Sequence, residues 1–312
     1  MAEAALAIVA LLGVLLLLLA RRMVRLDLPR DMLVARYAAA PSEFRTVAGA
    51  TLHVRDEGPR DAPAILLLHG FGVSLHLWDD WARLLTPRFR VIRPDLPGFG
   101  LTGPDPTGDY SDERTIAVIA ALLDDLGVAR AHVIGSSMGG RYAWRFAADH
   151  PERVDRLVLM APDGFSETGK DGKPTRIPWY FRLLPWMLPE RPLRKISAAG
   201  YADPAALTDA IFTRTHDLLR APGVRRAMLD RMAAMTRSDP TPILARITAP
   251  TLLLWGDTDR MIPHTHAADY KRAIPHADTV VLPALGHAPM EEAPEASLAP
   301  VLDFLSHAPS AA

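Results

Sequence analysis

Gly135-Ser136-Ser137-Met138-Gly139 is the stretch of this sequence that decides its fold. It directly follows an apolar run at 131–134, typical of a buried strand, and directly precedes a helix-like segment at 140–147. A Gly-x-Ser-x-Gly sequence between a strand and a helix indicates a nucleophile elbow, a turn so tight that bulky side chains two positions either side of the serine would collide. Glycine at both positions removes those side chains, so we predict that Ser137 is an accessible nucleophile.

Three further motifs lie at the ends of predicted apolar strands, in a fixed order along the chain. The strands are residues 65–68, 251–255 and 279–282, and they lead to the loop His69-Gly70-Phe71-Gly72, to Asp259 and to His287, respectively. The resulting order of nucleophile, acid and histidine resembles that of the α/β-hydrolase family. The resemblance covers residues 43–306, and within the family the chain is similar to the lid-bearing serine carboxylesterases and monoacylglycerol lipases.

This resemblance implies an α/β fold with a mostly parallel, doubly wound, eight-stranded sheet and an inserted helical lid. Strands alternate with helical patterns on both sides of Ser137, which favours one such domain. The alternation stops near residue 161, and this is where the family places its lid. We predict the following parts: a membrane anchor at 1–25, a juxtamembrane linker at 26–42, a core at 43–162 and 240–312, and the lid at 163–239.

The N-terminal segment predicts a transmembrane helix. Residues 4–20 carry no charge and are rich in Leu, Val and Ile, and Arg21, Arg22 and Arg25 follow them. At about 1.5 Å per residue this run is just long enough to cross a bilayer core of about 30 Å. Because the basic residues follow the span, the positive-inside rule places the catalytic domain on the cytoplasmic side. The alternative is a cleavable signal peptide, which would make the protein secreted or periplasmic.

The resemblance assigns the catalytic roles to Ser137 as nucleophile, His287 as general base and Asp259 as the orienting acid. Asp259 matches the family spacing Trp-Gly-x-x-Asp-x-x-x-Pro. Asp163, directly after a strand, occupies an acid position that some members use, and Asp257 is a further alternative.

The loop motifs imply supporting roles. The backbone N–H groups of Phe71 and Met138 are predicted to form the oxyanion hole. His69 is expected to brace the oxyanion loop, and Asp95 is expected to hold a turn through its backbone amides.

The predicted lid is rich in large apolar residues between 179 and 188 and carries methionines at helical spacing. Pockets are lined mainly by apolar groups, so we predict an apolar acyl pocket here, with the core of the lid itself as the alternative for each residue. The predicted substrate-binding residues are Trp179, Phe181, Trp186 and Met187.

Composition excludes several other functions. The net charge of −1 offers no basic surface for nucleic acid, and the absence of cysteine removes thiol catalysis and cysteine-bound metals. No metal or cofactor is expected, and the predicted partners are a small, apolar or lipid-like ester and a membrane. We predict a serine carboxylic-ester hydrolase that forms an acyl-enzyme. The alternatives are a carbon–carbon bond hydrolase of the same fold and a non-catalytic, membrane-tethered binding module.

Overall fold

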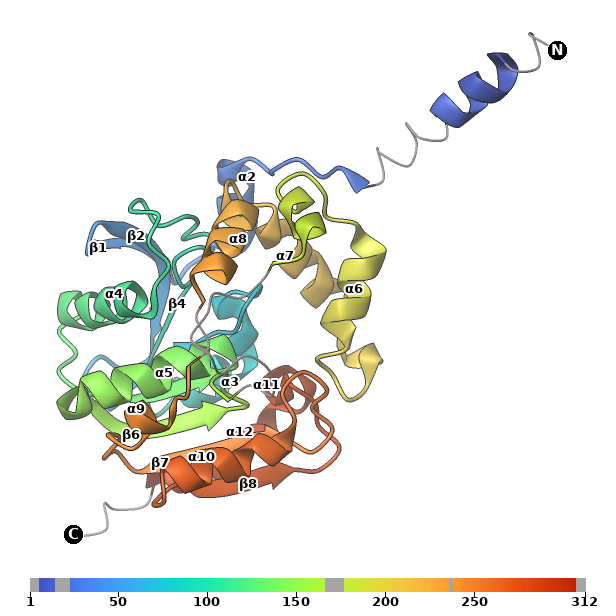
Figure 1. Ribbon diagram of the computed structural model, residues 1–312. Helices are drawn as coiled ribbons and strands as arrows, with labels where there is room; N and C mark the ends of the chain where they lie inside the picture. Colours follow the sequence, from blue (N-terminus) through green and yellow to red (C-terminus); the bar gives the residue numbers. More distant parts are fainter. Residues whose placement is uncertain (1–5, 15–22, 166–176, 236–237, 307–312) are drawn as a thin grey trace.

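A single eight-stranded sheet forms the centre of the protein in the computed structural model, which describes residues 6–14, 23–165, 177–235 and 238–306 (Figure 1). The strand order is β1-β2-β4-β3-β5-β6-β7-β8, which confirms the predicted sheet. The strands are β1 (Ser42–Val47), β2 (Ala50–Glu57), β3 (Ala64–Leu68), β4 (Arg90–Pro94), β5 (Ala131–Ser136), β6 (Val154–Met160), β7 (Thr251–Gly256) and β8 (Asp278–Leu282).

The sheet is antiparallel at one edge and parallel elsewhere. β1 and β2 form a hairpin in which Val47 pairs with Ala50, and β2 also runs antiparallel to β4. The turn places Ala48 and Gly49 at positive φ, a conformation that glycine adopts without strain. All later pairings, from β3–β4 to β7–β8, are parallel.

Side chains along β3 explain why helices cover both faces of the sheet. Leu66 and Leu68 belong to the hydrophobic core on one face, whereas Ile65 and Leu67 belong to the core on the other. Successive side chains of a strand point to opposite faces, so an uninterrupted aliphatic run needs a cover on both. The main helices of the domain outside the region between β6 and β7 are α3 (Asp79–Leu85), α4 (Asp112–Asp125), α5 (Met138–Asp149), α10 (Ala267–Ala273), α11 (Pro289–Glu292) and α12 (Pro294–Ser306).

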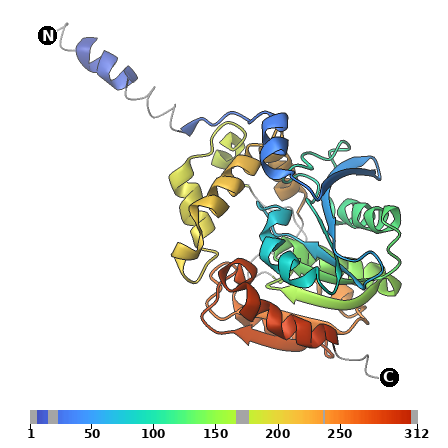
Figure 2. The same cartoon turned by 180° about the vertical axis from the view of Figure 1, so that it is seen from behind.

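Between β6 and β7 the described chain is helical. We call its residues 177–235 the insert; they contain η3 (Trp179–Leu183), α6 (Glu190–Ala198), η4 (Pro204–Ala206), α7 (Asp209–Leu219) and α8 (Val224–Ala234). These helices lie together at one end of the sheet in both views (Figures 1 and 2), and α9 (Thr241–Leu244) leads back to β7. The insert falls inside the predicted lid at 163–239, although residues 166–176 and 236–237 of that prediction lie outside the described residues. The lid boundaries stay a prediction.

The prediction of an N-terminal membrane anchor is wrong. Among the described residues no helix is long and apolar enough to cross a membrane. The described helix near the N-terminus covers residues 6–14, which at about 1.5 Å per residue spans roughly half of a bilayer core of about 30 Å. Residues 4–5 and 15–20 of the predicted span lie outside the described residues. The predicted membrane-anchored localisation therefore loses the helix on which it depended.

The predicted linker at 26–42 is packed against the domain. It contains the helix α2 (Arg30–Tyr37), and the side chain of Leu33 is completely buried in the main core. Arg36 and Tyr37 both donate hydrogen bonds to the carboxylate of Asp217 in α7, at 2.6 and 2.8 Å. The segment therefore joins the insert to the core.

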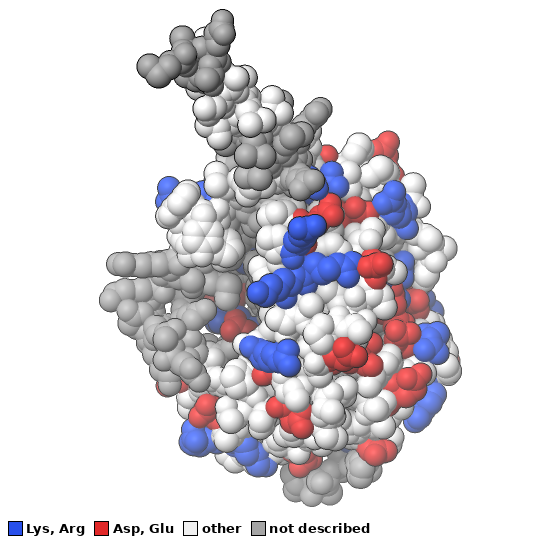
Figure 3. Space-filling view, turned by 90° about the vertical axis from the view of Figure 1, so that its right-hand side faces the viewer, with Lys and Arg blue, Asp and Glu red and all other residues white. Residues whose placement is uncertain are grey.

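On the face shown in Figure 3, acidic and basic side chains are interspersed, without a continuous basic surface. This arrangement agrees with the near-neutral net charge of −1.

Candidate active site

Ser137 lies in the strained turn that the sequence predicted. It follows β5, precedes α5 and has φ +55° and ψ −119°, a conformation that L-residues rarely adopt. A Cβ atom on Gly135 would lie 2.2 Å from the carbonyl oxygen of Gly139, and one on Gly139 would lie 2.1 Å from that of Leu68. Both glycines are therefore required by close backbone approaches, and the tight strand-to-helix turn predicted at Ser137 is present.

His287 and Asp259 form the predicted pair. His287 Nδ1 lies 2.7 Å from Asp259 Oδ2, and the carboxylate of Asp259 is completely buried. Asp259 Oδ1 accepts hydrogen bonds from the N–H groups of Met261 and Ile262 at 2.8 and 2.9 Å. Because a carboxylate only accepts, Nδ1 of His287 must carry a proton, which leaves Nε2 free to act as a base.

The two alternative acids serve other purposes. Asp257 Oδ1 accepts a hydrogen bond from the N–H of Ala284 at 2.8 Å, in the loop before His287. Asp163 lies 3.7 Å from the guanidinium group of Arg141. Among the interactions described for these two carboxylates, none involves His287, so the geometry favours Asp259.

The two loop residues predicted to be structural are confirmed in that role. His69 Nδ1 lies 2.8 Å from the carbonyl oxygen of Gly70, and His69 Nε2 accepts a hydrogen bond from the N–H of Leu96. Complete burial lowers the pKa of His69, which keeps the ring neutral in this brace. Asp95 accepts hydrogen bonds from the N–H groups of Leu75 and Leu101, both within 2.8 Å.

One cavity brings Ser137 and His287 together. Its volume is about 350 Å³, and both Ser137 and His287 lie in its wall. The side chain of Phe71 lines the cavity and packs edge-to-face on Phe99, with 5.3 Å between the ring centroids. Met138 is the first residue of α5, directly after Ser137. The roles of Phe71 and Met138 as oxyanion donors stay a prediction.

The remaining wall is mostly apolar and comes largely from the insert. Its described apolar side chains from the insert are Phe181, Leu184, Leu188, Leu193, Ile196, Leu207, Ile211, Leu219, Met228 and Met232.

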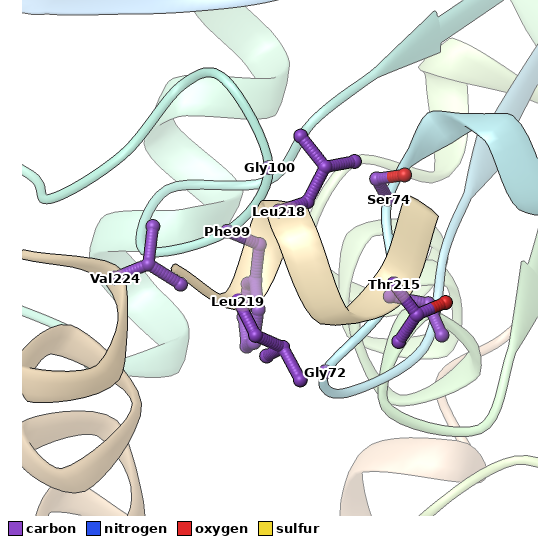
Figure 4. A pocket seen from close by; sticks show the side chains of 9 residues that line it. Gly72, Ser74, Phe99, Gly100, Thr215, Leu218, Leu219 and Val224 are labelled. Carbon is purple, nitrogen blue, oxygen red and sulfur yellow. The ribbon is translucent and has the colours of Figure 1, made fainter. Parts of the chain in front are cut away.

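A much smaller cavity adjoins the large one and shares Gly72, Val73 and Ser74 with it. Figure 4 shows the apolar side chains of Leu218, Leu219 and Val224 around it. Its volume of about 10 Å³ is at the lower limit for one water molecule, so it cannot take a substrate group.

Comparison with known proteins decides the family. The sequence profile of the alpha/beta hydrolase fold matches residues 63–294. A 2-hydroxy-6-oxononadienedioate/2-hydroxy-6-oxononatrienedioate hydrolase 2 of Pseudomonas putida is 31% identical over 269 residues, which cover 82% of this chain and 92% of that protein. The chain belongs to the α/β-hydrolase family.

Two other proteins show the range of this hydrolase's relatives. A 2-hydroxy-6-oxo-6-phenylhexa-2,4-dienoate hydrolase of Burkholderia cepacia is 29% identical over 264 residues, covering 82% of this chain and 91% of that protein. A crystal structure of a membrane phospholipase A matches with a TM-score of 0.73 and 26% identity, and the match covers 98% of each chain.

The structure separates the four residues predicted to bind substrate in this hydrolase. Of the four, Phe181 lies in the described wall of the cavity. Trp179 is 74% exposed, and Trp186, 59% exposed, lines an outer hollow instead. Met187 forms a β-bridge with Val24, so it holds the N-terminal segment against the insert. An apolar run alone could not reveal which side chains point inward.

Truncation of Phe181 should therefore affect long substrates, and truncation of Trp179 should not. We expect Phe181→Ala to raise KM for p-nitrophenyl octanoate roughly tenfold relative to p-nitrophenyl acetate, because an aromatic side chain no longer covers the longer acyl group. Trp179→Ala is the matched control. Equal effects of the two substitutions would contradict the assignment of Phe181 to the pocket wall.

Three polar residues of the cavity wall carried no signal in the sequence. Glu291 Oε2 accepts a hydrogen bond from the hydroxyl of Tyr201 at 2.5 Å, and Arg214 Nη2 donates to Glu291 Oε1 at 3.3 Å. Burial raises the pKa of Glu291 to about 7, while the bonds from Tyr201 and Arg214 oppose that rise. Among the described residues, no group of three or more His, Cys, Asp or Glu side chains is arranged to hold a metal ion.

Glu291 should make the stability of this hydrolase depend on pH. Its folded-state pKa of about 7 lies above the ordinary value of 4.5, so the folded protein binds the proton more tightly than the unfolded chain. Stability from this group is complete below about pH 4.5 and falls by about 3 kcal/mol as the pH rises through 7. We expect urea unfolding at pH 5 and pH 8 to show this loss in the native sequence but not in Glu291→Gln.

The exposed residue Glu295 provides the control for this measurement. Its side chain is 71% exposed, and Glu295→Gln should leave the pH dependence unchanged. A native-like pH dependence in Glu291→Gln would contradict the buried, proton-binding role of Glu291.

Proposed function

We propose that this protein is a serine hydrolase that cleaves a carbon–carbon bond next to a ketone in a small substrate. The observation that carries the proposal is the cavity of about 350 Å³ with Ser137 and His287 in its wall and Asp259 behind the histidine. The relatives from Pseudomonas putida and Burkholderia cepacia are named as hydrolases of keto-dienoates, which supports this substrate class.

The proposed reaction proceeds in two halves. His287 Nε2 takes the proton of Ser137 Oγ, the oxygen attacks the ketone carbon, and the developing oxyanion accepts hydrogen bonds from the N–H groups of Phe71 and Met138. Asp259 stabilises the imidazolium that forms. The carbon–carbon bond then breaks, the leaving carbanion takes the proton from His287, and water activated by the same histidine releases the acid from Ser137. One water molecule is consumed for each bond cleaved.

Two arginines support a substrate that carries a carboxylate. Arg214 and Arg225 both line the cavity, and the substrates in the relatives' names are acids. Arg214 forms an ion pair with Glu291, and Arg225 forms one with Asp27. A substrate carboxylate would therefore share each arginine with the carboxylate that already contacts it.

Hydrolysis of a carboxylic ester is the second candidate, and two observations favour it. The wall contributed by the insert is mostly aliphatic, which suits an acyl chain. The structural match that extends over 98% of this chain is to a phospholipase A, and phospholipases of that type cleave esters. Both candidates use the same attack by Ser137 on a carbonyl carbon.

We also propose that the predicted lid, residues 163–239, selects the substrate, and that residues 43–162 and 240–312 form the catalytic core. The apolar wall residues of the insert support this division.

A direct comparison of substrates tests the proposal. The purified protein is assayed with 2-hydroxy-6-oxo-6-phenylhexa-2,4-dienoate and with p-nitrophenyl esters of two to eight acyl carbons. We expect kcat/KM to be at least tenfold higher for the dienoate, with both activities lost in Ser137→Ala. A tenfold preference for an ester would replace the first candidate with the second, and turnover that survives Ser137→Ala would contradict both.

A further inference from the structure

The loop that carries His287 is hydrogen-bonded to the insert. The carbonyl oxygen of Gly200 accepts from the N–H of His287 at 2.7 Å and from the N–H of Ala288 at 3.2 Å. Gly200 directly follows α6 and its C-cap residue, Ala199, and lies in the wall of the catalytic cavity. The general base of the proposed reaction is therefore held from the insert as well as from Asp259.

The carboxylate of Glu292 joins the same two segments a second time. Its Oε2 accepts a hydrogen bond from the N–H of Ala202 at 2.8 Å, and its Oε1 accepts one from the N–H of Gly286 at 2.9 Å. Ala202 belongs to the insert, and Gly286 immediately precedes His287. One side chain thus bridges the insert and the histidine loop through two backbone groups.

The two segments also touch directly at Gly286. A Cβ atom there would lie 2.7 Å from both the N–H nitrogen of Ala202 and the carbonyl oxygen of Gly200. Such a distance is too short for any side chain, so the two backbones are in contact. A shift of residues 200–202 must displace the loop that carries His287.

The helix next to this contact, α6, is only partly buried. α6 has no fully buried side chain, although Leu193, Ile196 and Ser197 line the cavity. Its ion pairs, Arg194–Asp209 and Arg25–Glu190, involve exposed carboxylates, and exposed pairs contribute little to stability. Movement of α6 would therefore reach the catalytic histidine through residues 200–202.

We propose that Glu292 is a positioning residue that couples the insert to His287, so that the general base is correctly placed only when the insert is seated over the cavity. This inference rests on the proposed function, because it takes His287 as the base. It concerns the rate of the chemical step, whichever carbonyl substrate the cavity takes.

Glu292→Gln provides the test. Glutamine replaces one of the two acceptor oxygens with an NH₂ group, which would face a backbone N–H donor. With p-nitrophenyl acetate and p-nitrophenyl octanoate, we expect kcat to fall at least tenfold and by the same factor for both esters, while KM changes less than threefold. An effect on the shape of the pocket would instead alter KM and depend on chain length.

Two variants accompany this test. Glu292→Asp keeps both acceptor oxygens and should retain more of the native kcat than Glu292→Gln. Glu295→Gln makes the same chemical change on an exposed side chain of the neighbouring helix α12 and should match the native enzyme. Near-ultraviolet circular dichroism confirms that each variant is folded. If Glu292→Gln does not fold, the same criteria apply to Glu292→Ala, which removes both acceptor oxygens without placing an NH₂ group against a backbone N–H.

The outcomes separate this inference from the proposed function. A folded Glu292→Gln enzyme with kcat within twofold of native, or with a loss confined to KM, would overturn the inference alone. Native turnover that persists in Ser137→Ala would overturn the proposed function and the inference together.

Discussion

Replacing Ser137 with alanine is expected to lower kcat by about four to six orders of magnitude, because the nucleophile, base and acid act as a unit. The fold should survive, since alanine at φ +55° is no more strained than serine. The measurement is turnover of the dienoate and of the p-nitrophenyl esters, together with labelling by a fluorophosphonate probe. The probe should label Ser137 in the native enzyme and leave the variant unlabelled.

Two further variants make the assignment of Ser137 specific. Ser136→Ala should lose far less activity, because Ser136 is the last residue of β5, whereas Ser137 occupies the strained position between β5 and α5. Ser137→Gly should be as inactive as Ser137→Ala but more stable by about 1 kcal/mol, because glycine relieves the positive φ. Labelling of Ser136, or turnover that persists in either Ser137 variant, would show that another residue is the nucleophile.

Replacing Asp259 with asparagine should lower kcat by about 10⁴, since the amide can hold His287 in the wrong tautomer and cannot stabilise the imidazolium. The carboxylate of Asp259 is completely buried and lies 2.7 Å from His287 Nδ1. His287→Ala should resemble the serine variant in severity.

Asp257→Asn and Asp163→Asn are the matched controls for Asp259→Asn. Their carboxylates contact the N–H of Ala284 and the guanidinium of Arg141, so each substitution should cost much less activity. If Asp163→Asn were the most damaging of the three, the acid would lie after β6 and the assignment to Asp259 would be wrong.

The elements that the sequence predicted well are those governed by local rules. The run that became β3 is aliphatic over its full length, and β5 and β7 each have an aliphatic centre, as expected for strands that are buried on both faces. The glycines of the elbow were predictable for a related reason, because the turn allows no side chain at 135 or 139.

The anchor and the substrate-binding residues show where local rules fail. Hydropathy predicted a span at 4–20, yet among the described residues no helix meets the length and apolarity that a membrane requires. The apolar run from 179 to 188 did not indicate which of its side chains would point into the cavity. Phe181 lies in the cavity wall, whereas Trp179 and Trp186 are exposed on the outside. The direction of each side chain depends on which segments pack against it, and that packing cannot be inferred from the order of residues in the run.

The sequence by itself determined the strands and the elbow, because each depends on residues close together in the chain, and the order Ser137, Asp259, His287 came from the resemblance to the family. Only the tertiary structure decided which acidic groups share the cavity with Ser137 and what holds the histidine loop. Glu291 accepts hydrogen bonds from Tyr201 and Arg214, and Glu292 accepts one from Ala202. The partners in these bonds are 77 to 90 residues apart in the sequence. Such contacts form where the insert folds back over the carboxyl ends of the strands, and no periodicity or spacing encodes that approach.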